Sequence, residues 1–361
     1  MPIIRVEWLA GRSIDQRRAL VRRITDALED VAGLRRESIK VILHDVPPEN
    51  YGSAGDLLSE REPPKTGPSD LSTADALHGE RSGVDTSMVL RALVPELGGT
   101  SRVFDLEQPR TAEMPIHPAH KQAGYSYLLH RHHEEEYRPD EAGPRAGAAG
   151  IIICGEHTGT HIDALCHQSD ALTLYGGVPV GEVQSSRGFS KLAVDEIPPI
   201  LASGILLDIA ALEGVEALEP GRVVTEQDLA ACCEAQGVSV EPGSVALVHT
   251  GNTIHWADPE RYLAGPGMSA DASRWLAEKG VLAVGADNMA WDVPGLVDPD
   301  LGCLLPGHLI LLARQGIHIV ENLKTDELAA AGAHRFTFIC TPLKLVGATG
   351  SPVRPLAIVP G

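Results

Sequence analysis

A polar stretch at residues 63–84 divides this chain of 361 residues into two parts of very different length. It reads PPKTGPSDLSTADALHGERSGV, is rich in Pro, Gly, Ser, Thr and Asp, and shows no sustained hydrophobic period. Such a composition is typical of a linker between folded units. We therefore expect a small domain at residues 1–62, a linker at 63–84 and a large domain at 85–361.

The small part shows the pattern of a strand, a helix and a second strand. Residues 3–9 and 39–43 are apolar runs, and Ser13 with Gln16 has the form of a capping box. Between the runs, apolar residues recur at helical spacing: Leu20, Ile24, Leu28 and Val31. Two strands joined by a helix pair in parallel through a right-handed crossover. A unit of about 60 residues buries a marginal core, so we expect it to need partners.

The large part alternates between short apolar runs and helical stretches. The runs stand at 151–154, 204–209, 245–249, 281–284, 317–320 and 336–339. The helical stretches stand at 226–236, 270–279 and 309–315. This alternation predicts an α/β domain with many strands.

Composition excludes some classes of partner. The net charge of −19 and an aromatic content of 4% argue against nucleic acid. No apolar run is long enough to cross a membrane, and no charged-then-apolar signal segment opens the chain, so we expect a cytoplasmic protein. The six cysteines form no C-x-x-C pair, which favours reduced thiols.

Three histidines and an aspartate follow one another as H-x-x-x-H-x-D-x-x-x-H in the stretch HTGTHIDALCH. On a straight strand, His157 and His161 would lie about 13 Å apart, too far for one ion, whose bonds to histidine are about 2 Å. The intervening TGT is poor helix sequence, which leaves a tight turn at Gly159. Asp163 then points the same way as His161. This ligand set suits zinc, manganese or iron; the alternative is polar loop residues with ordinary hydrogen bonds.

That stretch resembles the H-x-G-T-H-x-D-A-x-x-H signature of the metal-dependent cyclase family, which includes bacterial kynurenine formamidases and isatin hydrolases. The segments PGMSADASRWLAEKGVLAVGADN and GHLILLARQGIHIVENL extend the resemblance over roughly residues 100–360. It implies a swivelling β/β/α fold, usually dimeric or tetrameric. It also implies a metal set that two-metal members complete with a further histidine and glutamate: His157, His161, Asp163, His308 and Glu321.

Further residues of the large part are candidates for the same site. His167 matches the family's general base. Glu321 ends an apolar run, where a buried carboxylate needs a cation. His117 and His120 are expected to line the substrate pocket, together with Trp291 at the end of a predicted strand. The histidines of LLHRHHEEEY form either a solvated surface or a flap over the site.

The opening of the chain carries a second candidate site. Removal of Met1 would leave Pro2 with a secondary amine, which serves as a general base when burial and nearby cations such as Arg12 and Lys40 lower its pKa. The pattern P-I-I-x-V-x-x-L-x-G-R-S resembles the 4-oxalocrotonate tautomerase family over residues 2–61. The resemblance implies that Pro2 shuttles a proton and Arg12 binds a carboxylate. Lys40 stands where that family carries a second arginine, and Tyr51 where it carries phenylalanine.

Together these patterns predict a bifunctional enzyme acting on a small molecule. We expect the large domain to be a hydrolase that uses one or two divalent ions, zinc or manganese, to cleave a formamide or cyclic amide of an aromatic or keto-acid substrate. The small domain would add tautomerase activity, and the chain would form a homo-oligomer without nucleic acid or membrane. The alternative is a cyclase, dehydratase or lactonase on a polyketide-like substrate, with the small domain serving only oligomerisation.

Overall fold

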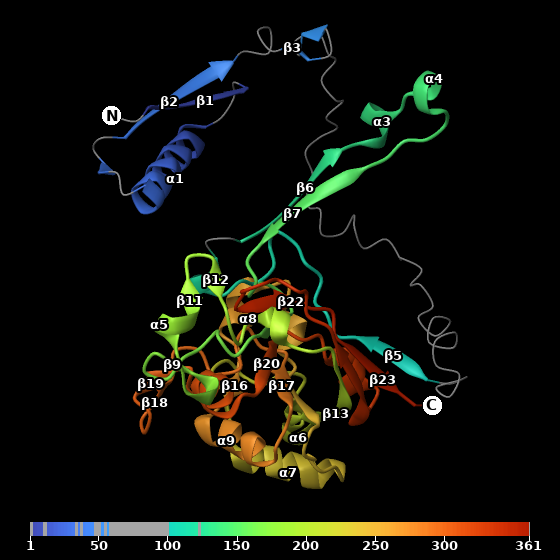
Figure 1. Cartoon of the computed structure of the whole chain (residues 1–361). Helices are drawn as coiled ribbons and strands as arrows, with labels where there is room; N and C mark the ends of the chain where they lie inside the picture. Colours follow the sequence, from blue (N-terminus) through green and yellow to red (C-terminus); the bar gives the residue numbers. More distant parts are fainter. Residues whose placement is uncertain are drawn as a thin grey trace. The chain divides into compact units, whose positions relative to one another are not determined.

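The computed structural model of the chain describes residues 3–9, 13–32, 35–36, 39–46, 52–53, 56–57, 101–121 and 124–360 (Figure 1). The chain divides into two compact units, Met1–Ser82 and Gly83–Gly361. Each unit is described by itself below.

The first unit is the strand–helix–strand element that the sequence predicts. Strand β1 (Ile3–Leu9) pairs in parallel with β2 (Lys40–Val46), and α1 (Ile14–Ala32) connects them. On α1 the side chains of Leu20 and Ile24 are half-buried whereas Arg18 and Arg22 are exposed, as an amphipathic helix requires. Two further short strands, β3 (Gly52–Ser53) and β4 (Asp56–Leu57), pair antiparallel.

The second unit is built on a nine-stranded mixed sheet with the order β22-β8-β20-β17-β15-β13-β21-β23-β5. Its four central strands, β20, β17, β15 and β13, run parallel to one another, and every other pair of neighbouring strands in the sheet is antiparallel. The strands are β5 (Arg102–Asp105), β8 (His161–Asp163), β13 (Ile200–Asp208), β15 (Val245–His249), β17 (Ala283–Ala286), β20 (His318–Glu321), β21 (Arg335–Cys340), β22 (Gly350–Pro352) and β23 (Leu356–Val359).

Helices make the crossovers that parallel strands require. The helices that connect the parallel strands are α6 (Ile209–Glu213), α7 (Glu226–Gln236), α8 (Pro259–Leu263), α9 (Ala270–Glu278), α10 (Pro306–His308) and the π-helical η9 (Leu309–Gln315). Helices α7 and α9 pack against each other beneath the sheet in Figure 1. Helix α7 begins at a capping box formed by Thr225 and Asp228, and it ends at Gly237 in the left-handed conformation.

Both faces of the sheet are buried, because side chains alternate along its strands. On β13, Leu206 packs into one hydrophobic core whereas Ile205 and Leu207 pack into the other. The second core lies against α7 and α9, and it includes Leu229 and Leu276 from these helices. This explains why the central strands read as continuous apolar runs.

Smaller elements complete the unit. They are η5 (Pro118–His120), β9 (Thr173–Leu174), η6 (Tyr175–Gly177), β10 (Val178–Pro179), α5 (Val180–Val183), β11 (Gln184–Ser185), β12 (Gly188–Phe189), η7 (Val194–Glu196), β14 (Val223–Val224), η8 (Asn252–His255), β16 (Gly267–Met268), β18 (Val297–Asp298), β19 (Cys303–Leu304) and α11 (Asp326–Ala330).

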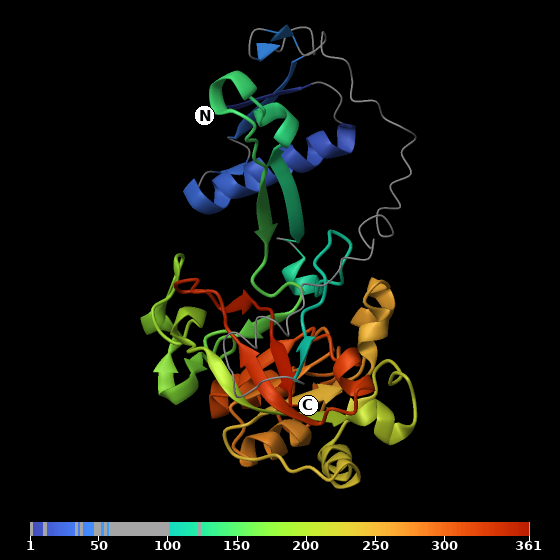
Figure 2. The same ribbon diagram turned by 90° about the vertical axis from the view of Figure 1, so that its right-hand side faces the viewer.

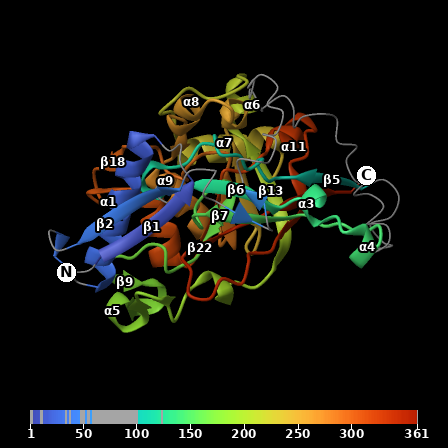
Figure 3. The same cartoon turned by 90° about the horizontal axis from the view of Figure 1, so that it is seen from above.

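One hairpin stands away from the sheet. Strand β6 (Tyr125–Arg131) pairs antiparallel with β7 (Ala149–Cys154), and the short helices α3 (His133–Glu136) and α4 (Pro139–Ala142) lie at the far end (Figures 2 and 3). The run at 151–154 is therefore a strand, as predicted, but it is not part of the buried sheet. Its side chains are exposed, Ile152 by 64% and Ile153 by 60%.

No helix within the described ranges is both long enough and apolar enough to cross a membrane.

Candidate metal centre

Two neighbouring strands bring the histidine-aspartate motif together with a glutamate. Strands β8 and β20 are antiparallel, and Glu321 is the direct cross-strand partner of His161. His161 and Asp163 project from the same face of β8, whereas Ile162 between them lies in the hydrophobic core. The side chains of His161, Asp163 and Glu321 are all buried, so the sheet holds two carboxylates side by side away from water.

The chain turns sharply at Gly159, which has a φ of +62°. Arg110 stabilises the turn by donating to the carbonyl oxygens of Thr158 and Thr160, and Asn322 Nδ2 donates to the Gly159 oxygen at 3.0 Å. A Cβ at Gly159 would come 2.7 Å from Arg110 Nη1, so a larger residue would displace the guanidinium. The turn brings the rings of the two flanking histidines to a centroid distance of 5.1 Å, nearly perpendicular to each other.

Asp163 and Glu321 each direct one carboxylate oxygen towards His161 and the other towards His308. His161 Nε2 lies 3.5 Å from Asp163 Oδ1 and 3.4 Å from Glu321 Oε2. On the other side, His308 Nε2 from α10 lies 3.6 Å from Asp163 Oδ2 and 3.2 Å from Glu321 Oε1. His157 adds its Nδ1 at 2.8 Å from Asp163 Oδ1. The nitrogen and oxygen atoms thus form two groups, one around His161 and one around His308, and the carboxylates of Asp163 and Glu321 belong to both.

Hydrogen bonds outside the cluster fix which nitrogen of His161 and His308 faces it. His161 Nδ1 donates to the Gly159 carbonyl at 2.8 Å, and His308 Nδ1 donates to Asp292 Oδ2 at 2.7 Å. The Nε2 atom of each ring is therefore directed at the carboxylates, where it carries a second proton or binds a cation. Such outer partners are typical of histidines that bind metal ions.

His157 is oriented by a longer chain of hydrogen bonds. The Thr349 hydroxyl donates its single hydrogen to Glu156 Oε1 at 2.6 Å, so it accepts from His157 Nε2 at 2.8 Å. Nδ1 of His157 is left facing Asp163. A Cβ at Gly350 would lie 2.6 Å from His157 Cε1, so glycine leaves the room that this ring needs.

One oxygen of the cluster has no hydrogen-bond partner. Asp163 Oδ2 is fully buried and is not hydrogen-bonded to any part of the chain that the structure describes. A buried carboxylate oxygen left in this way is costly unless a cation binds it. Imidazole nitrogens and carboxylate oxygens suit zinc, manganese or iron, so the residues present fit a divalent ion.

The pKa shifts agree with a site built for positive charge. Burial opposes ionisation of Glu321, but hydrogen bonds from His161 and His308 outweigh it and lower the pKa of Glu321 to about 2. Burial likewise opposes protonation of His308, but hydrogen bonds with Asp292 and Glu321 raise its pKa well above the usual 6.5. The raised pKa values of His161 and His308 favour positively charged rings beside the two carboxylates, and a divalent ion would take the place of those protons.

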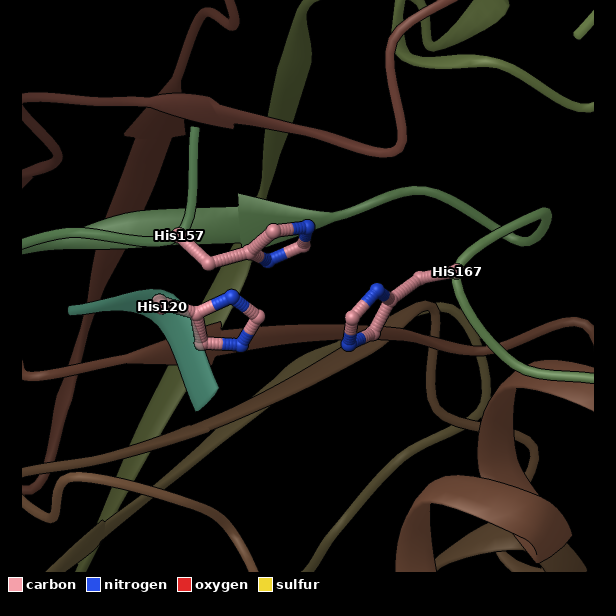
Figure 4. Close-up of side chains that lie close together, drawn as sticks. All are labelled: His120, His157 and His167. Carbon is pink, nitrogen blue, oxygen red and sulfur yellow. The ribbon is translucent and has the colours of Figure 1, made fainter. Parts of the chain in front are cut away.

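The side chains of two more histidines, His120 and His167, lie beside that of His157 (Figure 4). The ring of His167 lies 4.0 Å from that of His157, and the ring of His120 stacks on His157 at 4.8 Å. Burial lowers the pKa of His167 to about 3 and that of His120 to about 4, so both are neutral near pH 7. His117 follows outward, with its ring 5.7 Å from that of His120.

His167 lies close enough to serve either of two roles. Its ring nitrogen falls within 4.8 Å of ligand atoms of Asp163 and His308, and also of His120 and His157. A neutral imidazole at this place can accept a proton from a reacting group or bind an ion.

Two adjoining cavities open onto the cluster. The inner cavity, of about 170 Å³, is lined by His161, His308 and Glu321 among others, and the outer cavity has about 930 Å³. Both cavities are lined by Ala119, His120, His157 and His167, and His117 lines the inner one. His117 and His120, which the sequence suggested as pocket residues, thus each line a cavity, and their contact with a substrate stays a prediction.

Trp291 lies elsewhere than the sequence suggested. Its side chain is fully buried in the core beneath the sheet, where the indole N–H donates to Ser273 Oγ at 2.9 Å. The residue contacts the cluster only through its backbone N–H, which donates to Glu321 Oε1 at 2.8 Å. Its position after a strand gave no sign that the ring turns inward.

The proposed tautomerase residues are only partly covered by the structure. Lys40 is the first residue of β2, opposite Ile3 on β1, and its side chain is exposed. Pro2, Arg12 and Tyr51 lie outside the described residues.

Sequence patterns missed the residues that orient the ligands. Thr349 lies 192 residues from His157, and Arg110 lies 48 residues from Thr158. No local spacing connects such pairs. Asp292 stood next to a residue that the sequence singled out, but its contact with His308 depends on where α10 begins.

The mixed sheet and its cluster of histidines and carboxylates, which fits a divalent metal ion, together indicate an α/β enzyme. The chain belongs to the cyclase family, whose model, described as "Putative cyclase", matches residues 104–293, and its first part belongs to the tautomerase family, whose model, "Tautomerase enzyme", matches residues 2–61. The fusion of two enzyme domains that the sequence predicts is thereby confirmed.

Similar proteins are known for each part. A "Probable tautomerase" of Halalkalibacterium halodurans is 41% identical over 61 residues, which are 17% of this chain and 100% of the relative. A kynurenine formamidase of Bacillus cereus is 27% identical over 255 residues, 71% of this chain and 96% of the relative.

Solved structures resemble the second unit. A crystal structure of a novel cyclase has a TM-score of 0.65 and 28% identity, covering 74% of this chain and 89% of that one. Isatin hydrolase A from Ralstonia solanacearum shares the fold, with a TM-score of 0.56 and 22% identity, covering 76% of this chain and 97% of that one.

Proposed function

We propose that the second unit is a hydrolase that uses a divalent ion to cleave a formamide or a cyclic amide of a small substrate. The observation that carries this proposal is the buried Oδ2 of Asp163, which accepts no hydrogen bond from the described residues and is set among histidine nitrogens and a second carboxylate. Similarity to the Bacillus cereus kynurenine formamidase supports the type of reaction.

The cluster has places for one or two ions, which we propose to be zinc or manganese. One ion would be held by His157, His161 and Asp163 Oδ1, and a second by His308, Asp163 Oδ2 and Glu321. Bound there, such an ion lowers the pKa of water and polarises a carbonyl group.

The remaining steps fall to groups of the chain. His167 is neutral, borders both cavities and is within reach of the cluster, so it acts as the general base. The inner cavity holds the group to be cleaved, and the outer cavity holds the body of the substrate. His120 borders both cavities and His117 borders the inner one, so both lie where they can contact the substrate.

The test combines metal content with turnover. Protein freed of metal by a chelator should be inactive on aryl formamides and isatin and should regain activity with zinc or manganese. Turnover of lactones or cyclisation of polyketide-like substrates, without amide hydrolysis, would instead favour the cyclase, dehydratase or lactonase alternative. Full activity without metal would refute both.

We further propose that the first unit is an active tautomerase with Pro2 as base, Arg12 and Lys40 as the cationic groups and Tyr51 at the substrate. Its family membership supports this assignment. Pro2→Ala should abolish turnover of simple enols and leave the oligomeric state unchanged. If wild-type protein shows no such turnover, the unit serves assembly alone.

Self-association of the chain is part of the proposal. Apolar side chains are exposed on both strands of the β6–β7 hairpin, among them Tyr127 and Leu128 as well as Ile151. A two-stranded hairpin by itself is marginally stable in water, so contact with a second copy would stabilise it.

A further inference from the structure

The two cavities differ in size and in their position relative to the metal cluster. The inner cavity reaches the ligand side chains and has about 170 Å³, whereas the outer cavity has about 930 Å³. The inner space holds a scissile group and at most about one ring. A larger substrate body therefore extends into the outer cavity, and the linings of both cavities determine what it can be.

The outer wall is largely apolar. Ile152 and Ile153 of β7 form part of it, and Leu343 and Leu345, from the segment after β21, form another part. Pro352 and Ala119 add further apolar surface. Such walls favour a ring or another hydrocarbon body.

Positive side chains are missing from both cavities. Within the described ranges, neither lining contains a lysine or an arginine. Arg110, which lies beneath the metal loop, is held by Glu107 at 2.8 Å and by carbonyl oxygens of the Gly159 turn. Among the residues that the structure describes, none therefore places a guanidinium or ammonium group in these cavities to bind a carboxylate of the substrate's body.

The acidic groups of the lining are engaged as well. Glu321 belongs to the metal cluster, and both oxygens of Glu156 accept hydrogen bonds from Thr349, at 2.6 Å from its hydroxyl and 3.1 Å from its backbone N–H. A substrate ammonium group would have to compete with these contacts. An amino-acid head would therefore enter the cavity without charged partners, which is costly.

We infer that the substrate of this site has an uncharged, apolar and preferably aromatic body, and that neither a carboxylate nor an amino-acid head is recognised. Since this rests on the proposed hydrolase activity, it narrows the amide substrates to neutral aryl formamides and neutral cyclic amides. Keto acids and N-formyl amino-acid derivatives are excluded as preferred substrates.

A matched pair of substrates tests the inference on the metal-loaded full chain. 4-Formamidoacetophenone and 4-formamidobenzoate have the same scissile group and nearly the same shape, and only the second is charged. We expect kcat/KM to be at least tenfold higher for the ketone. Equal values, or a preference for the carboxylate, would overturn the inference while leaving the hydrolase intact. Absence of turnover with both compounds and with isatin would refute the proposed hydrolase and the inference with it.

A variant makes the same test from the side of the protein. Leu343 is 54% exposed on the outer wall, so Leu343→Arg should fold, and Leu343→Met is its matched control. We expect the arginine to shift the ratio of the two kcat/KM values at least fivefold towards the carboxylate, with no shift in the methionine variant. If wild-type protein already prefers the ketone but the arginine leaves the ratio unchanged, the preference does not come from the missing positive charge and the inference is wrong.

Discussion

Glu321 and His161 lie directly opposite each other on the antiparallel strands β20 and β8, and their side chains approach to 3.4 Å inside the buried edge of the sheet. The backbone pairing of two strands thus sets the separation of two ligand atoms.

Asp163 offers one oxygen to each side of the cluster, so its loss should empty the site. We expect Asp163→Asn to be isolated without metal and to hydrolyse amides only at the background rate, because a neutral amide binds divalent ions weakly. Elemental analysis of the purified protein measures this, with the exposed Asp300→Asn as control. Stoichiometric metal in Asp163→Asn would contradict the assignment.

His161 and His167 should respond differently to replacement. His161→Ala should lose the metal itself. His167→Ala should keep near-normal metal content and substrate affinity, while turnover falls by about 10²–10⁴-fold, the usual loss when a general base is removed. Metal content and single-turnover rates separate the two effects. A metal-free His167→Ala protein would show that His167 is a ligand, and His117 and His120 would then be the candidates for the base.

Asp292 positions His308 by accepting from its Nδ1 and from the backbone N–H groups of Gly307 and His308. We expect Asp292→Asn to weaken metal binding by about 10–100-fold, the usual effect of losing such an outer carboxylate. Competition with a chromophoric chelator measures the affinity. Asp298→Asn, on β18, is the control, and an unchanged affinity in Asp292→Asn would show that the carboxylate does not orient the ring.

The raised pKa of His308 gives the metal-free protein a characteristic pH dependence. A group whose pKa is higher in the folded state contributes stability that is fully present below its unfolded pKa, about 6.5, and is lost as pH rises through the folded value. Metal-free protein should therefore lose unfolding free energy above pH 6.5, whereas metal-loaded protein should not, because the ion replaces the proton. Urea unfolding between pH 6 and pH 9 tests this. His308→Gln should reduce the slope, and the exposed His133→Gln should leave it unchanged.

The exposed hairpin predicts an effect on assembly. Leu128 is 61% exposed, so Leu128→Glu should change the unfolding free energy of the isolated chain by less than about 0.5 kcal/mol. We expect it to lower the oligomeric state measured by light scattering, because a charge would be buried against the second copy. Leu282→Glu, at an exposed site after α9, serves as control. An oligomer that persists in Leu128→Glu would show that the hairpin is not at the interface.

The sequence predicted most strands of the second unit because parallel strands buried on both faces leave long apolar runs, as at Leu206 and Leu247. It predicted the turn at Gly159 because no other backbone could bring His157 and His161 together. It could not predict that the run at 151–154 stands in an exposed hairpin, since apolar side chains look alike whether the chain itself or a second copy covers them.

Local sequence patterns could not predict the residues that orient the ligands, for a different reason. Thr349 and Asp292 act through hydrogen bonds that exist only once distant strands have paired. For Trp291 the sequence predicted a pocket residue where the structure has a core residue, because a large ring beside a strand end suits a pocket and a core equally well. Burial decided between the two, and burial depends on the packing of α9.

The hydrogen bond between Thr349 and His157 also sets an order of events during synthesis. Strand β22, which follows Thr349, pairs with β8 and comes into existence only after nearly all of the second unit has left the ribosome. Until then His157 lacks its hydrogen-bond acceptor Thr349, and β8 lacks its neighbour β22. A nascent chain therefore carries every histidine of the motif before the contacts that orient His157 exist, so the proposed ion would be bound only once the second unit has folded.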